Sequence, residues 1–68
     1  MTLKEVNSSN IKRVGYEGDT LLVEYLSGSM YAYKKVPKTV FDNFLESDSK
    51  GRFMNNSIKG KYEYEKIN

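Results

Sequence analysis

The feature that most constrains the fold of this chain is a change of periodicity halfway along its 68 residues. Between Ile11 and Val36 there are three short runs with branched and aromatic residues, separated by turn residues, which is typical of β-strands. From Pro37 onward, apolar residues recur every three or four positions, which is typical of helices that bury one face. Strands followed by helices in so short a chain predict a single α+β domain over residues 1–68.

The first half of the chain is predicted to form a three-stranded antiparallel meander over residues 11–36. Its strands cover residues 11–16, 20–26 and 30–36, and its turns cover residues 17–19 and 27–29. The Gly, Asp and Ser residues of these turns are the types that tight turns favour. Residues 62–67 alternate as a strand would, so this segment either adds an edge strand or remains a loose tail.

The register at the second turn decides which face of the sheet carries the tyrosines, because a slip of one residue exchanges the two faces. A two-residue loop pairs Tyr25 with Met30 and puts Tyr31 and Tyr33 on the face opposite Val23. A three-residue loop pairs Tyr25 with Tyr31 and Val23 with Tyr33. We favour the three-residue loop, since the large residues then form one continuous face for helices to cover: Leu21, Val23, Tyr25, Tyr31 and Tyr33.

Two short helices, over residues 37–46 and 50–59, are predicted to cover that face. The first begins at Pro37, whose fixed φ and missing N–H suit the first position of a helix. The second begins after Ser49, a residue type common at N-caps, and ends before Gly60, a residue type common just beyond a helix. The faces predicted to pack on the sheet are Val40, Phe41, Phe44 and Leu45 from the first helix, and Phe53, Met54, Ser57 and Ile58 from the second.

These stretches also carry a family resemblance. The chain resembles KTSC domains over residues 6–64, through Ser8-Ser9, Ile11, Val14-Gly15-Tyr16, Tyr31 and Tyr33, Val36-Pro37 and the stretch from Gly51 to Tyr62. Two positions depart from the family pattern: Glu17 stands where Asp is usual, and Phe53-Met54 replaces a Tyr-Phe pair. Both keep size and polarity, so the resemblance implies the family fold but no role for a hydroxyl at position 53.

KTSC domains are short modules at the C-terminus of some lysyl-tRNA synthetases, and they also occur as stand-alone small proteins. The family has no established function, and RNA binding has been suggested for it. The resemblance therefore implies a small binding module with RNA, or a smaller anionic ligand, as the expected partner.

Composition excludes most classes of enzyme. The chain contains no Cys and no His, so it lacks catalytic triads, imidazole bases, zinc clusters and thiol chemistry. Its five glycines form neither a dinucleotide-binding motif nor a P-loop. We therefore expect a protein that is not an enzyme and that uses no cofactor or metal.

Length and hydropathy lead to expectations about location and assembly. No apolar run is long enough to cross a membrane, and the first residues lack the apolar core of a signal peptide, which predicts a cytoplasmic protein without membrane contact. A chain of this length buries only about 60% of the surface that it exposes when unfolded. Because neither disulfides nor a metal add stability, we expect homo-oligomers.

Candidate binding residues gather in the last third of the chain. Between Ser49 and Tyr62 there are four basic residues and no acidic one: Lys50, Arg52, Lys59 and Lys61. At helical spacing, cations and short polar donors share one arc there, as a phosphate-binding surface requires. An ordinary solvated helix face would show the same pattern. The primary candidate residues are Arg52, Asn55, Asn56, Lys59, Lys61 and Tyr62.

The six tyrosines supply a second set of candidates. Tyr31 and Tyr33, beside Lys34 and Lys35, would stack on RNA bases if they were exposed on the sheet. The alternative, which we favour, is that both tyrosines belong mainly to the core and that their hydroxyls reach a polar edge. The tyrosines expected to make exposed contacts are then Tyr16, Tyr62 and Tyr64.

Three functions remain open at this point. The first, which we favour, is a non-catalytic module that binds RNA through the basic helix face. The second is a protein-interaction or self-assembling module. The third is an oligomer that binds a small anion or nucleotide between subunits, with Arg52 and Lys59 in the site.

Overall fold

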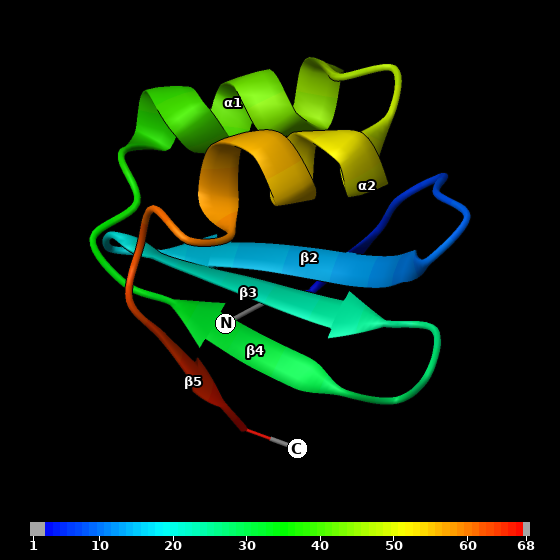
Figure 1. Cartoon of the computed structure of the whole chain (residues 1–68), viewed down its shortest axis with the longest axis horizontal. Helices are drawn as coiled ribbons and strands as arrows, with labels where there is room; N and C mark the ends of the chain where they lie inside the picture. Colours follow the sequence, from blue (N-terminus) through cyan, green and yellow to red (C-terminus); the bar gives the residue numbers. More distant parts are fainter. Residues whose placement is uncertain (1–2, 68) are drawn as a thin grey trace.

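The computed structural model describes residues 3–67 and contains one antiparallel sheet of five strands in sequence order. The strands are β1 (Lys4–Glu5), β2 (Ile11–Glu17), β3 (Thr20–Tyr25), β4 (Met30–Tyr33) and β5 (Tyr64–Lys66). Between β4 and β5 the chain forms helix α1 (Lys38–Glu46), helix α2 (Lys50–Phe53) and the π-helical turn η1 (Met54–Ile58). The helices lie together over one face of the sheet (Figure 1). The α+β class is therefore as predicted, but the sheet has five strands instead of three.

The two additional strands form the edges of the sheet. β1 pairs with β2, with Lys4 opposite Val14, and β5 pairs with β4, with Tyr33 opposite Tyr64. The alternation of residues 62–67 left an edge strand as one of two alternatives, and the structure confirms that alternative. β1 has only two residues, which is too few for an alternation to be recognised in the sequence.

The β3–β4 hairpin has the predicted faces in a different register. Val23 pairs with Tyr31, so the predicted pairing of Tyr25 with Tyr31 is wrong by two residues. The turn closes earlier than expected: the Gly28 N–H donates to the Tyr25 carbonyl (3.0 Å), and the Tyr25 N–H donates to the Ser29 carbonyl (2.8 Å). Gly28 permits this turn because its φ is 101°. Since a shift of two residues preserves the alternation, the tyrosines still face the helices.

The core lies between the helices and this face of the sheet. Phe44 of α1 is fully buried, and its ring meets that of Phe53 edge-on, with centroids 5.8 Å apart. The two predicted helix faces pack against this core, as expected. The fully buried side chains are Ile11, Val14, Leu21, Val23, Val36, Phe44, Met54 and Ile58.

The helix ends differ from the prediction in two ways. Pro37 is the N-cap of α1 and not its first residue. The second helix is α-helical only over Lys50–Phe53 and continues as a π turn, in which the Lys59 N–H donates to the Met54 carbonyl (2.7 Å). Lys59 then has an extended backbone, and Gly60 has φ of 80°, which confirms a glycine beyond the helix. Residues after a π turn leave the α-helical arc.

No helix formed by residues 3–67 lies over the other face of the sheet (Figure 1). There the Arg13 Nε donates to Glu24 Oε1 across β2 and β3 (2.6 Å), and this bond lowers the pKa of the Glu24 carboxyl. Within residues 3–67, no helix is long and apolar enough to cross a membrane. The same residues contain no group of three or more His, Cys, Asp or Glu side chains suited to holding a metal.

Candidate nucleic-acid interface

Four tyrosines from three neighbouring strands form a contiguous cluster on the helix-facing side of the sheet. Tyr31 and Tyr33 alternate on β4, Tyr64 lies opposite Tyr33 on β5, and Tyr25 ends β3. The ring centroids of Tyr31 and Tyr64 are 5.7 Å apart, and those of Tyr33 and Tyr64 are 5.6 Å apart. These separations are typical of favourable aromatic pairs. We call these four residues the tyrosine cluster.

The cluster runs from the core to the surface at the edge of the sheet. Tyr33 is only 3% exposed, Tyr25 and Tyr31 are half-buried, and Tyr64 is 60% exposed. The core interpretation is therefore confirmed for Tyr33, and Tyr64 is exposed as expected. Tyr31 and Tyr64 provide an aromatic surface, and Tyr33 anchors that surface in the fold.

Burial also changes the chemistry of the cluster. It raises the pKa of the Tyr33 phenol above its ordinary value, and the nearby Tyr25 hydroxyl raises this pKa further. The two hydroxyls do not meet the geometry of a hydrogen bond, since the buried Tyr25 oxygen has no hydrogen-bond partner among the described residues. Tyr33 is thus a neutral, structural member of the cluster.

Lys59 brings a positive charge to the tyrosine cluster. Its Nζ lies 5.4 Å from the centroid of the Tyr25 ring, a cation–π contact of a kind that stabilises by about 0.5–1 kcal/mol at exposed sites. The position follows from the end of the helical segment, because the extended Lys59 and the positive φ of Gly60 turn the chain back toward the sheet. The result is an ammonium group held beside aromatic rings.

Three shallow hollows adjoin along this region. The central hollow has a volume of about 400 Å³ and is lined by Tyr31, Tyr33, Lys59, Gly60 and Tyr64. It shares Tyr31 and Lys59 with a hollow of about 410 Å³ at the β3–β4 loop. It shares Gly60 and Tyr64 with a hollow of about 570 Å³ beside β5. We call the three hollows together the tyrosine groove.

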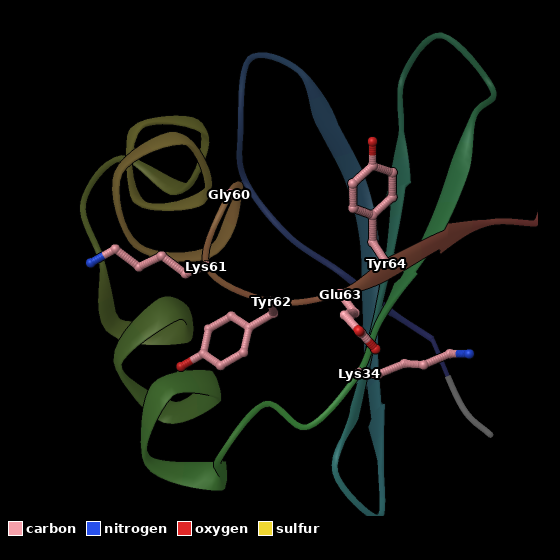
Figure 2. A pocket seen from close by; sticks show the side chains of 6 residues that line it. All are labelled: Lys34, Gly60, Lys61, Tyr62, Glu63 and Tyr64. Atoms are coloured by element: carbon pink, nitrogen blue, oxygen red, sulfur yellow. The ribbon is translucent and has the colours of Figure 1, made fainter.

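The hollow beside β5 has mixed charge. Its lining comprises Lys34, Gly60, Lys61, Tyr62, Glu63 and Tyr64, which Figure 2 shows as sticks. In this view Tyr62 lies on the side of the helices, and Lys61 and Lys34 extend to opposite sides. Because the two ammonium groups do not converge and Glu63 lies between them, this hollow does not hold a single anion between its two lysines.

The structure divides the basic arc predicted on the second helix. Arg52 and Asn56 line a separate hollow of about 310 Å³ that also contains Asp48, and Asn55 is exposed. Lys59, Lys61 and Tyr62 instead line the tyrosine groove. The expectation of one continuous arc is therefore corrected, because the π turn and the extended Lys59 carry the chain away from the α-helical line.

The secondary candidates also separate. Tyr31, Tyr33 and Lys34 line the groove, whereas Lys35 is exposed and has φ of 59°, in the left-handed region. Tyr25 was considered only as part of the core, yet its ring supports Lys59. The alternation of β3 already placed it on the same face as Tyr31.

Two of the tyrosines expected to be exposed are partly buried. The Tyr16 ring stacks on Phe41, with centroids 4.8 Å apart and an interplanar angle of 13°, and its hydroxyl donates to the Val36 carbonyl. Tyr62 is half-buried and packs against the core. The expectation for Tyr16 is corrected: it holds α1 and the β4–α1 connection against β2.

Comparisons with known proteins agree on the fold. The model of the KTSC domain family matches residues 7–62. The chain is 42% identical over 67 residues to a protein named lysine–tRNA ligase from Trichormus variabilis, a match that covers 96% of this chain and 12% of the ligase. It is 40% identical to an uncharacterized protein from Stutzerimonas stutzeri, with 91% of this chain and 92% of that protein covered. The crystal structure of a KTSC domain protein from Yersinia pestis matches with a TM-score of 0.91 and 37% identity, covering 98% of this chain and 97% of that one.

Proposed function

The chain belongs to the KTSC domain family, and we propose that it is a non-catalytic module that binds single-stranded RNA in the tyrosine groove. The observation that carries this proposal is the position of Lys59 beside the half-buried Tyr31 and the exposed Tyr64 in one groove. Proteins that hold single strands combine aromatic rings, on which bases stack, with cations that contact the backbone.

The relatives support an RNA ligand by analogy. The proteins from Trichormus variabilis and Nostoc punctiforme are named lysine–tRNA ligases, and the chain spans 12% of the length of each. A module found within proteins that act on tRNA has RNA available as a ligand, although function does not follow from fold alone. The activity of the ligases is not part of this proposal.

The groove fits a single strand better than a duplex. Its three hollows follow one another between the end of the helical segment and strands β4 and β5, and the rings of the tyrosine cluster line them. Bases must be unstacked and turned outward to reach such rings, which a single strand allows and a duplex does not. Tyr64 is the ring most accessible for this contact.

A matched pair of variants tests where the RNA binds. Lys59→Ala with Lys61→Ala removes two cations from the groove, and Arg52→Ala with Lys12→Ala removes two from elsewhere. Both pairs lower the formal net charge from +2 to 0, so they differ only in where the charge is lost. Fluorescence anisotropy with a short oligouridine at several salt concentrations gives the affinity and its salt slope.

We expect the groove pair to make the slope of log affinity against log salt concentration less steep by about 1.4, because each lost phosphate contact removes about 0.7 from the slope. The control pair should change this slope little. Tyr64→Ala should weaken binding by about 1–3 kcal/mol, whereas Tyr64→Phe should bind as the parent does, because stacking needs only the ring. Melting temperatures of all variants should stay within a few degrees of the parent.

Three outcomes would contradict RNA binding in the groove. If the control pair loses the greater share of the affinity, the site is the hollow of Arg52 and Asn56 with the neighbouring Asn55. We favour this hollow less, because Asp48 also lines it and repels phosphate. If the parent binds neither oligouridine nor tRNA at low salt, the RNA proposal is wrong and the protein-interaction or self-assembling function replaces it. Binding of free nucleotides but not of oligomers would favour the small-anion function.

A further inference from the structure

The hollow at the β3–β4 loop forms one end of the tyrosine groove and is lined mainly by polar residues. Besides the tyrosine rings and Leu26, it is lined by Ser9, Asn10, Ser27, Ser29 and Lys59, and none of its lining side chains is acidic. It adjoins the central hollow through Tyr31 and Lys59. We call it the end hollow, since the groove continues from it in one direction only, toward β5.

Two loops that are distant in the sequence build the end hollow. Ser9 and Asn10 precede β2, and Ser27 and Ser29 belong to the β3–β4 loop. The Leu26 N–H donates to the Asn10 carbonyl (2.9 Å), which ties the two loops together. Lys59 reaches the hollow from the end of the helical segment and is held there by its contact with Tyr25.

The polar groups of the end hollow are available as hydrogen-bond donors. The hydrogen bonds within residues 3–67 do not use the hydroxyls of Ser9, Ser27 or Ser29. The Asn10 side chain accepts a bond from the Ser8 hydroxyl through Oδ1 (3.2 Å), so its Nδ2 keeps its donors for another partner. The residues that line this space thus carry three hydroxyls, one amide and one ammonium group.

This set of donors matches a terminal phosphate. A terminal phosphate has three acceptor oxygens and a charge of about −1.5 to −2 at neutral pH. A phosphodiester within a strand has one charge and fewer free oxygens, so it would leave several of these donors unpaired. The position of the hollow at one end of the groove also suits the end of a strand.

We propose that the end hollow binds the terminal phosphate of an RNA strand whose bases lie along the tyrosine cluster. This inference rests on the proposed function of the groove and adds to it a preference for a phosphorylated strand end. Lys59 supplies the countercharge, and Ser27 and Ser29 distinguish a phosphate from a hydroxyl at that end.

The test compares three forms of one short oligouridine: with a 5′-phosphate, with a 3′-phosphate and with neither. We expect the parent to bind one of the phosphorylated forms about tenfold or more tightly than the unphosphorylated form, as hydrogen bonds to a charged group would provide. In Ser27→Ala with Ser29→Ala the ratio between the affinities for the phosphorylated and unphosphorylated forms should fall to near one. The matched control, Thr39→Ala with Ser49→Ala, removes two exposed hydroxyls outside the groove and should keep the preference.

The outcomes separate the two proposals. If the parent binds the unphosphorylated oligouridine and shows no preference among the three forms, the end-hollow inference is wrong and the groove proposal stands. If the preference survives in Ser27→Ala with Ser29→Ala, the phosphate binds elsewhere. Inorganic phosphate and uridine monophosphate are compared as competitors of the phosphorylated oligouridine. If the two compete equally strongly, the hollow binds a free anion and not a strand end. If the parent binds none of the oligomers at low salt, the groove proposal fails and this inference fails with it.

Discussion

The stability of the folded chain depends strongly on the single residue Phe44. Its side chain is fully buried and meets Phe53 edge-on. Phe44→Ala should lower the free energy of unfolding by about 3–5 kcal/mol, because it removes a ring and leaves a cavity. That loss is a large part of the stability of a small domain, about 5–15 kcal/mol. Urea denaturation followed by circular dichroism measures it, with the exposed Asp42→Ala as the control. A loss below about 1 kcal/mol would contradict the buried position.

Tyr33 makes the stability depend on pH in alkaline solution. In the unfolded chain its phenol titrates near the ordinary pKa of 10.0, and burial raises this pKa in the folded protein. Its contribution to stability is therefore fully present below about pH 10 and is lost as the pH rises further, because the unfolded state then releases a proton that the folded state retains. The urea midpoint of the parent should fall more steeply above pH 10 than that of Tyr33→Phe. Parallel curves for the parent and Tyr33→Phe would refute the prediction.

Among the connections between helices and strands, the one between β4 and α1 contains the clearest backbone strain. The Val36 N–H donates to the Asp19 carbonyl (2.7 Å), and the Tyr16 hydroxyl donates to the Val36 carbonyl, so the connection is held from both sides. Lys35 takes a left-handed backbone there, with φ of 59°. This conformation costs about 1–2 kcal/mol for a residue with a Cβ.

Lys35→Gly should therefore stabilise the fold by about 0.5–1 kcal/mol, after about 0.5–1 kcal/mol is subtracted for the greater freedom of glycine in the unfolded chain. The adjacent Lys34→Gly removes the same charge at a position without positive φ and should destabilise by about 0.5–1 kcal/mol. Thermal and urea unfolding of both variants measure the difference. A Lys35→Gly variant less stable than the parent would show that the left-handed conformation carries no such cost.

For the whole molecule, we expect self-association. The chain has 68 residues and no Cys or His, and in the described part of the chain helices cover only one face of the sheet (Figure 1). If copies of the chain associate in the folded state, the melting temperature rises with protein concentration, since association stabilises only the folded form. Melting curves over a hundredfold range of concentration, together with light scattering, measure this. A constant melting temperature and the mass of a single chain would establish a monomer.

The sequence by itself determined the α+β class, the central strands and the faces of both helices. Each of these follows from a local pattern, such as the spacing of Val40, Phe41 and Phe44 on α1 or the branched and aromatic residues of β3. The face that carries the tyrosines was predicted correctly although the register of the β3–β4 hairpin was wrong by two residues. A register shift by an even number of residues leaves every side chain on the same face of the sheet. Gly60 marked the end of the helical segment for the same local reason.

Only the tertiary structure decided which residues form the candidate site. Lys59 was predicted beside Arg52, but the π turn of η1 moves it to Tyr25, and no local pattern distinguishes that turn from an α-helix. Ser9 and Ser27 meet in the end hollow because the Asn10 carbonyl accepts the Leu26 N–H, a bond between loops far apart in the sequence. The periodicity of a sequence indicates which side of a helix or strand is buried. The groove depends instead on which strands pair and where the helices end. Strand pairing and helix ends are decided by the packing of the whole chain.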